Sequence, residues 1–214
     1  MTYLKYCTLA SILALATAVA FQSCSADPVH ADNPSALEDA LTEAMATEVT
    51  LGSRPIGHCR HAGPNDGDEW FRCRRRLRAF AQYFIAAAEE YNGDPWLLAA
   101  IARKESGFYP FAQGGVGEGG IMQLHPRNRR NREAAEFVRR SREPAYIRRC
   151  RRTVGACQQD VVRRAAQILQ LTSQRCDNPR AALNAYNLGA RCDARWRYAG
   201  RVYEIRNRMM NGGR

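Results

Sequence analysis

The chain has 214 residues and a formal net charge of +11. This length suits one domain with additions, since a domain usually takes about 100–200 residues. A strongly basic exported protein suits an anionic partner such as lipid headgroups, wall polymers or acidic glycan peptides. Nucleic acid is the usual alternative partner for such a charge, but an export signal and the cysteine content argue against it.

The N-terminus is typical of an export signal. Lys5 supplies a short positive region, and the apolar run from Leu9 to Phe21 is interrupted only by Ser11 and Thr17. The run is too short for a membrane span, which needs about 20 apolar residues. We therefore interpret residues 1–23 as a signal peptide and predict an exported, periplasmic protein.

Two processing sites remain open. Ala18-Val19-Ala20 suits ordinary signal peptidase, whereas Cys24 would be the acylated first residue of an outer-membrane lipoprotein, although the residues before it match the lipoprotein box poorly. Cysteine counting favours Cys24 slightly. Of the eight cysteines, Cys7 leaves with the signal, and acylation of Cys24 leaves an even set that suits three disulfides in an oxidising compartment: Cys59, Cys73, Cys150, Cys157, Cys176 and Cys192.

Residues 24–56 are predicted to form an acidic tether with one amphipathic helix. Ser35 and Glu38 form a capping box, and apolar residues then recur at a spacing of four, at Leu37, Leu41, Met45 and Val49. Nothing in this segment indicates catalysis. The predicted main domain therefore comprises residues 57–214.

The next loop holds His58, Cys59 and His61, and Cys73 follows. A zinc site and a Cys59–Cys73 disulfide both fit this pattern. The oxidising compartment favours the disulfide, so we predict no metal. The acidic patch at 66–69 lacks the spacing of a calcium loop and is interpreted as a helix N-cap.

Two helices are predicted next from their apolar faces. The first ends at Gly93, and the second begins with Asp94 as its N-cap. On the second helix Glu105 shares a face with Leu98 and Ile101. A carboxyl group on an apolar face should have a raised pKa, because desolvation disfavours its charged form. Such a group can stay protonated near neutral pH and give its proton to the leaving oxygen of a glycosidic bond.

The segment Arg127–Arg152 is rich in arginine. Such a run is either a solvated face or a surface that binds peptide carboxylates, since the planar fork of arginine binds carboxylates bidentately. Further helices are predicted at about 160–174, 179–188 and 194–209, and any strand would be short and lie near residues 114–120. The predicted fold class is all-α, with at most a very short β element.

Three motifs together resemble one known family. They are ESGFYP at 105–110, GEGGIMQLHP at 117–126 and ALNAYNLGA at 182–190. In order and spacing they are similar to the signatures of the lytic transglycosylases of bacterial cell walls, which are related to goose-type lysozymes. The resemblance covers about residues 77–209. It implies a lysozyme-like α domain at 57–214, a monomer without a cofactor, and peptidoglycan glycan strands as the partner.

The resemblance also implies roles for particular residues. Glu105 would protonate the oxygen between N-acetylmuramic acid and N-acetylglucosamine. It would then take the proton of the muramyl sugar's primary hydroxyl as a 1,6-anhydro ring closes. The Tyr186 hydroxyl would form a hydrogen bond near Glu105. The predicted substrate contacts come from Ser106, Gly120, Met122, Gln123, Tyr186 and Asn187.

Three positions depart from the family pattern. Gly114 stands where related enzymes often carry a serine, and His125 replaces a residue that is usually apolar or small. Glu118 stands where alanine is usual, and a second carboxylate is what a water-using glycosidase needs. A lysozyme-type muramidase that uses Glu118 therefore stays open as an alternative, as does a non-catalytic wall-binding module.

Local spacing predicts the pairing of the six cysteines. We expect disulfides between Cys59 and Cys73, Cys150 and Cys157, and Cys176 and Cys192. The last of these would clamp the helix that carries Tyr186 and Asn187.

Overall fold

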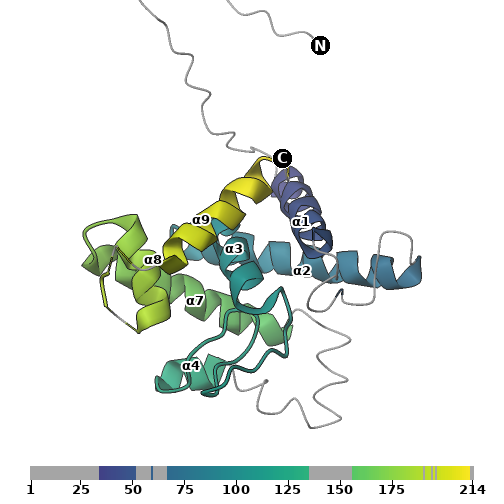
Figure 1. Ribbon diagram of the computed structural model, residues 1–214. Coiled ribbons are helices and arrows are strands. Elements are labelled where there is room, and N and C mark those ends of the chain that lie inside the picture. The colour runs from purple at the N-terminus through teal and green to yellow at the C-terminus, as the bar shows by residue number, and fades with distance from the viewer. Residues whose placement is uncertain are drawn as a thin grey trace, which may run out of the picture. The chain divides into compact units, whose positions relative to one another are not determined.

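The computed structural model describes residues 34–51, 59, 67–134, 156–189, 191–193, 195 and 197–212 (Figure 1). The chain divides into two compact units, Met1–Asp32 and Asn33–Arg214. Only the second unit contains described residues. The predicted signal peptide, Cys24, His58, His61, Cys150 and the side chain of Cys157 lie outside the described residues, as does most of the arginine-rich segment after residue 134.

The described part of the chain is all-α, as predicted. It forms seven helices: α1 (Pro34–Thr50), α2 (Asp68–Glu90), α3 (Pro95–Ser106), α4 (Arg129–Ala134), α7 (Ala156–Arg175), α8 (Pro179–Leu188) and α9 (Arg197–Met210). The β structure among these residues consists of isolated bridges that pair Gly119 with Gln113 and with Leu124. They lie at the edge of the segment where a short strand was expected. None of the described helices has the length and apolar character required to cross a membrane.

Helix α3 lies in the middle of the fold and packs against α1, α2, α7 and α9 (Figure 1). Its side chains from Leu98 to Ala102 are buried. The Asp94 side chain caps its N-terminus by accepting a hydrogen bond of 2.9 Å from the Trp96 backbone, as the sequence predicts. Gly107 ends the helix in the left-handed conformation, with φ of 60°. Two caps therefore fix both ends of the helix that carries Glu105.

Helix α1 is part of the main unit. Its apolar stripe, Leu41, Met45 and Val49, is buried in the same core as the faces of α2 and α9. The sequence placed this helix on a tether and began the main domain at residue 57, whereas residues 33–214 form one compact unit. The reason is that an amphipathic helix gains stability only by burying its apolar face. The functional division at residue 57 stays a prediction.

The start of α2 differs from the expectation. The N-cap is Gly67, and it makes no side-chain hydrogen bond to the helix. The acidic patch around Asp68 therefore does not cap α2 with a side chain. Helix α2 is held instead by its buried apolar face, which includes Leu77, Phe80 and Phe84.

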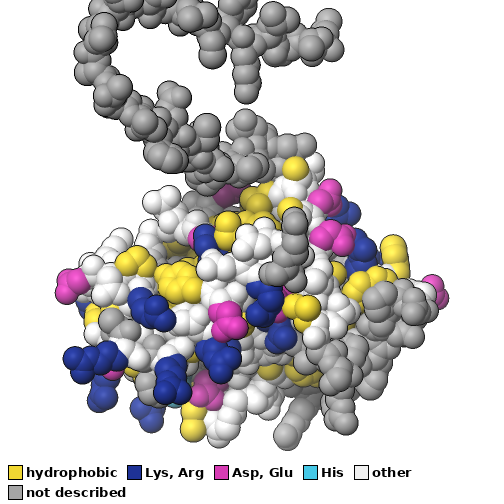
Figure 2. All heavy atoms as spheres, turned by 45° about the horizontal axis from the view of Figure 1, so that its top comes forward, with side chains coloured by type: hydrophobic (Ala, Val, Ile, Leu, Met, Phe, Trp, Pro, Cys, Tyr) yellow, Lys and Arg dark blue, Asp and Glu magenta, His cyan; other side chains and the backbone are white. Residues whose placement is uncertain are grey.

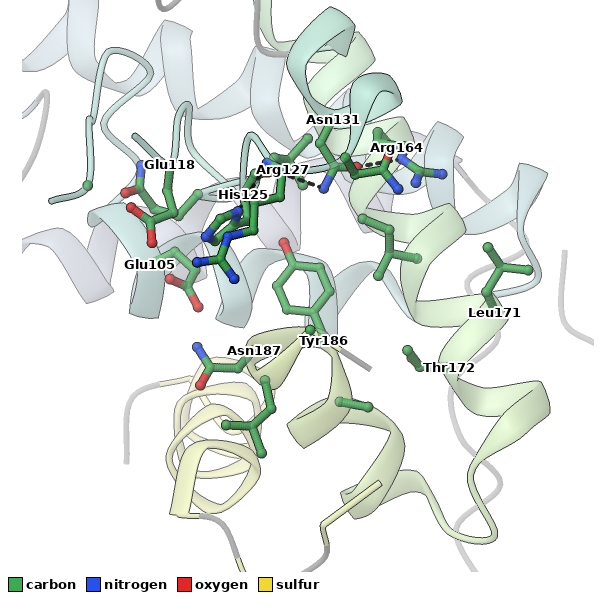
Figure 3. A pocket seen from close by; sticks show the side chains of 18 of the residues that line it. Glu105, Glu118, His125, Arg127, Asn131, Arg164, Leu171, Thr172, Tyr186 and Asn187 are labelled. Atoms are coloured by element: carbon green, nitrogen blue, oxygen red, sulfur yellow. Dashed lines mark hydrogen bonds between the residues drawn. The ribbon is translucent and has the colours of Figure 1, made fainter. Parts of the chain in front are cut away.

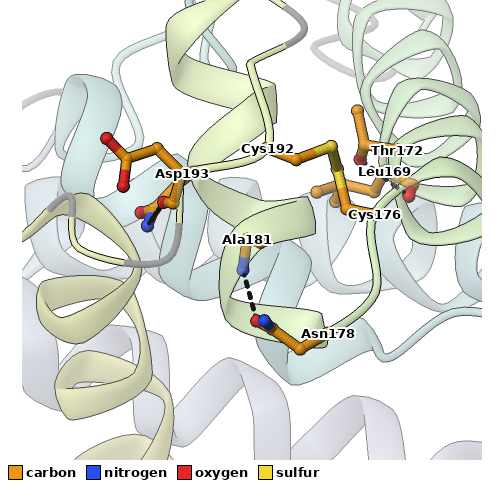
Figure 4. Close-up of a disulfide and its surroundings, with 8 residues drawn as sticks. Leu169, Thr172, Cys176, Asn178, Ala181, Cys192 and Asp193 are labelled. Atoms are coloured by element: carbon orange, nitrogen blue, oxygen red, sulfur yellow. Dashed lines mark hydrogen bonds between the residues drawn. A yellow bond between two sulfur atoms is a disulfide. The ribbon is translucent and has the colours of Figure 1, made fainter.

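Two disulfides join parts of the described chain. Cys59 pairs with Cys73 at the start of α2, with Cα atoms 5.4 Å apart. Cys176, just after α7, pairs with Cys192, beyond α8, with Cα atoms 5.5 Å apart (Figure 4). These are two of the three pairings expected from local spacing. The second closes a loop with a sequence separation of 16, for which stabilisation of about 3 kcal/mol is typical.

Candidate active site

A cleft of about 900 Å³ opens beside the end of α3 (Figure 3). Its walls come from Glu105 on α3, the loop between α3 and α4, and one face each of α7 and α8, with Asn131 from α4. In Figure 3, Glu105 and Glu118 lie on one side of the Tyr186 ring, and Arg164 and Leu171 lie on the other. The cleft thus has two carboxyl groups on one side and basic and apolar side chains on the other.

Glu105 occupies the last turn of α3 and reaches the cleft from the core. Within the described residues, its Oε1 atom is buried and has no hydrogen-bond partner. Burial raises the pKa of Glu105 above its ordinary value, and the charge of Glu118 adds to the effect. The nearby Tyr198 hydroxyl and the Lys104 ammonium group oppose it. Desolvation is the largest of these influences, so the carboxyl group holds its proton to a higher pH than an exposed glutamate.

Two tyrosines surround this carboxyl group. The Tyr186 hydroxyl from α8 donates a hydrogen bond of 2.7 Å to the Met122 carbonyl oxygen. The sequence placed this hydrogen bond near Glu105, and the structure shows that the loop carbonyl is its acceptor. The Tyr198 hydroxyl from α9 is buried and has no hydrogen-bond partner within the described residues. The pKa of each tyrosine is raised well above its ordinary value, first by burial and then by the charge of Glu105.

Tyr198 received no role from the sequence, because it lies outside the three motifs. Its place near Glu105 depends on how α9 packs across α3, which no local pattern shows. Asn184 fixes that packing, because its fully buried side chain accepts a hydrogen bond of 2.8 Å from the Ala199 backbone and also donates to the Asp193 carbonyl. Asn184 lies inside the ALNAYN motif, so the motif contains a residue that positions Tyr198.

The loop after α3 is held by amide side chains. Gln123 has a left-handed backbone, with φ of 45°, and its Nε2 atom donates to the carbonyl oxygens of Ala112 (3.1 Å) and Gly120 (2.9 Å). A non-glycine residue in this conformation costs of order 1–3 kcal/mol, which these hydrogen bonds help to offset. Gln158 on α7 is buried and bonds both to the Ile121 amide and to the Pro110 carbonyl. Sequence reasoning missed Gln158, because its partners are far away in the chain.

Three predicted substrate contacts lie outside the cleft lining. The Ser106 hydroxyl is within hydrogen-bonding distance of the carbonyl oxygens of Ala102 (3.1 Å) and Ile121 (2.9 Å) and so joins α3 to the loop. Gly120 and Met122 are buried behind the loop surface. By contrast, Gln123, Tyr186 and Asn187 line the cleft. Direct contact of Ser106, Gly120 and Met122 with substrate stays a prediction. In the structure these residues lie behind the loop that forms the cleft wall.

Two departures from the family pattern are linked. A Cβ atom on Gly114 would collide with the Glu118 carboxyl group and lie 3.0 Å from Gln123 Oε1. Glu118 Oε2 also accepts a hydrogen bond of 3.2 Å from the Val116 backbone. A serine at position 114 would therefore displace the carboxyl group. The absence of a side chain at Gly114 makes room for Glu118 at the cleft.

Comparison with known proteins supports the resemblance seen in the motifs. A family model described as the transglycosylase SLT domain matches residues 82–147. The matched segment contains Glu105, Glu118 and Gln123 and ends before α7. No solved structure matches the chain. This part of the chain resembles the lytic transglycosylases, and the match supports a function of transglycosylase type on peptidoglycan.

Proposed function

We propose that this protein is a peptidoglycan lytic transglycosylase that cleaves the β-1,4 bond between N-acetylmuramic acid and N-acetylglucosamine. The observation that carries the proposal is Glu105, a desolvated carboxyl group at the wall of a large cleft, whose Oε1 atom has no hydrogen-bond partner among the described residues. The family match over residues 82–147 supports a reaction of the transglycosylase type. The 1,6-anhydro product is part of the proposal.

The proposed reaction needs only one carboxyl group. The protonated Glu105 gives its proton to the glycosidic oxygen as the bond from that oxygen to the muramyl anomeric carbon breaks. The Glu105 carboxylate then takes the proton from the primary hydroxyl of the same muramyl sugar. The oxygen of that hydroxyl bonds to the anomeric carbon and closes the anhydro ring. No water is consumed, and Glu105 ends the cycle protonated.

The surroundings of Glu105 suit both halves of this cycle. Burial raises the pKa of Glu105, so its acid form persists to a higher pH than that of an exposed glutamate. The Tyr198 hydroxyl lies near the carboxyl group and lowers the pKa, so it favours the carboxylate that must exist transiently. The Tyr186 hydroxyl already donates to the Met122 carbonyl oxygen. Within the described residues, the tyrosine hydroxyl near Glu105 that has no other acceptor is therefore that of Tyr198.

A hydrolase is the second candidate, and Glu118 is the observation that favours it. Glu118 lines the same cleft as Glu105 and is close enough for its charge to raise the Glu105 pKa. An inverting glycosidase uses such a second carboxylate to activate water. One Glu118 oxygen accepts a hydrogen bond from Val116, so the other oxygen would have to orient that water.

Replacement of Glu105 by glutamine tests the assignment. Glu105→Gln should lower the rate on purified cell walls by about 100-fold or more, the scale of a general acid. The variant should fold normally, because glutamine keeps the size and shape of the side chain and cannot ionise at this buried site. Glu89→Gln, an exposed site on α2 outside the cleft, is the matched control and should keep wild-type activity. A well-folded Glu105→Gln variant with wild-type activity would overturn the proposal.

A further inference from the structure

One face of α7 forms the cleft wall opposite Glu105 and Glu118. Arg164, Ile168, Leu171 and Arg175 all line the cleft and follow one another at spacings of four, three and four residues. This spacing places them on one face of a helix. We call these four residues the α7 wall. It has a basic side chain at each end and two apolar side chains between them.

Among the described residues, no ion pair joins a cation of the α7 wall to an acidic side chain. Glu105 and Glu118 are the acidic residues of the cleft lining, and no ion pair joins either to Arg164 or Arg175 among the described residues. Arg127 adds a third guanidinium group from the loop. Figure 2 likewise shows basic side chains gathered on part of the protein surface, with fewer acidic ones among them. An anionic ligand would complete this half of the cleft.

Arg164 is held in place by neighbouring polar side chains. Its Nε atom donates to Asn131 Oδ1 at 2.8 Å, and its Nη1 atom donates to Gln167 Oε1 at 2.5 Å. Asn131 is itself buried and donates to the His125 carbonyl oxygen at 3.1 Å. The Nη2 atom has no partner within the described residues. Partial burial, followed by the nearby charge of Arg130, lowers the Arg164 pKa, and Tyr91 opposes this shift.

The apolar part of the α7 wall is exposed to the same cleft. Leu171 is 51% exposed although it is a large hydrophobic side chain. Sugar rings offer hydroxyl groups and apolar C–H faces but no negative charge, whereas a peptide with alanine residues and free carboxylates offers both methyl groups and anions. The arginines at the two ends of the wall are separated by 11 residues, or about 16 Å along the helix. An extended peptide of about four or five residues spans that length.

We propose that the α7 wall binds the peptide stem of the glycan strand, with Arg164 and Arg175 on its carboxylates and Ile168 and Leu171 on its methyl groups. This inference rests on the proposed function, because it takes the glycan strand as substrate, and it adds that the stem determines which strands are cleaved. The wall lies beyond residues 82–147, the segment that the family model matches.

Three forms of one substrate test the proposal. Uncrosslinked glycan strands are used with their free-carboxylate stems, with those carboxylates converted to amides, and with the stems removed by an amidase. The wild-type full-length protein should show a KM about 10-fold or more lower for the free-carboxylate strands, the scale of one charge-assisted hydrogen bond. Equal KM values for free and amidated strands would overturn the proposal.

Charge variants test which arginines are responsible. Arg175→Gln should bring the KM ratio between amidated and free strands toward one, and Arg164→Gln should do the same. Arg175 makes no hydrogen bond that supports the fold among the described residues, so its variant remains informative if Arg164→Gln fails to fold. Arg201→Gln removes the same charge from an exposed site on α9 outside the cleft and should keep the wild-type ratio. An equal change in all three variants would indicate general electrostatic attraction and contradict a site on α7.

A binding measurement separates this proposal from the proposed function. Glu105→Gln protein should bind fluorescent free-carboxylate strands more tightly than amidated ones. If it does so while the wild-type protein cleaves neither, the proposed function fails and the stem site stands. If the wild-type protein cleaves all three substrates alike, the stem site fails and the proposed function stands. Should Arg175→Gln instead lose affinity for vesicles with anionic headgroups and keep its strand preference, a membrane surface is the ligand and the proposal is wrong.

Discussion

Glu48 provides a test of how α1 is joined to the helix that carries Glu105. Its side chain is 1% exposed and lies between two arginines of other helices. Arg208 on α9 donates at 2.6 Å and 3.0 Å, and Arg103 on α3 donates at 3.3 Å. Glu48→Gln removes the negative charge while it keeps the shape. Among the described residues, the Arg103 guanidinium would then have no acidic partner, and Arg208 would keep only the exposed Glu204 at 3.9 Å.

The expected cost follows from the burial of the three side chains. Removal of one partner from a fully buried ion pair costs about 3–5 kcal/mol. The arginines are 25% and 31% exposed, so water compensates part of the loss and we expect about 2–3 kcal/mol. For a unit of this size that corresponds to a Tm lowered by about 4–12 °C.

The assay is urea unfolding of the full-length protein, followed by circular dichroism, with an exposed pair as the control. Glu43 on the same helix pairs with Arg74, but both side chains are about half exposed. Glu43→Gln should therefore cost less than about 1 kcal/mol. If Glu48→Gln costs no more than Glu43→Gln, the ion pairs do not hold α1 to α3 and α9, and our reasoning about this cluster is wrong.

Two further predictions concern acidity and location. The kcat/KM should fall as pH rises through the raised Glu105 pKa, because only the protonated form can donate a proton. Tyr198→Phe should move this fall to higher pH, and Glu118→Gln should move it to lower pH. Shifts in the reverse directions would contradict the assigned causes. We propose a lipid anchor at Cys24, because its acylation leaves an even number of cysteines. Cys24→Ala should then move the protein from the membrane fraction to the soluble periplasmic fraction. A wild-type protein that is already soluble and begins at Phe21 would refute the anchor.

Local patterns in the sequence predicted much of this fold. The stripe on α1 and the Asp94 cap depend on neighbours within one or two helical turns, and the structure contains them. The two described disulfides also link cysteines that are close in the sequence. Glu105 was found by its place on an apolar helix face together with the motifs.

The remainder depended on contacts between distant segments. Glu48 is buried beside the apolar stripe of α1, but its partners lie 55 and 160 residues away and no local rule identifies them. Tyr198 and Gln158 are polar residues on helices. Which groups they contact is determined only when the helices pack together. The α7 wall is also of this kind, because Arg164 and Arg175 look like solvated charges until α8 and the loop close the cleft around them.

The identity of the product tests the central claim most directly. Purified cell wall is digested with the wild-type protein in water enriched in heavy oxygen, and the released muropeptides are weighed by mass spectrometry. Ring closure by the muramyl hydroxyl adds no water, so we predict anhydro-muropeptides that carry no heavy oxygen and lack the mass of one water molecule. Reducing-end sugars that all carry the heavy oxygen, and that disappear in Glu118→Gln, would contradict the transglycosylase and establish the hydrolase in its place.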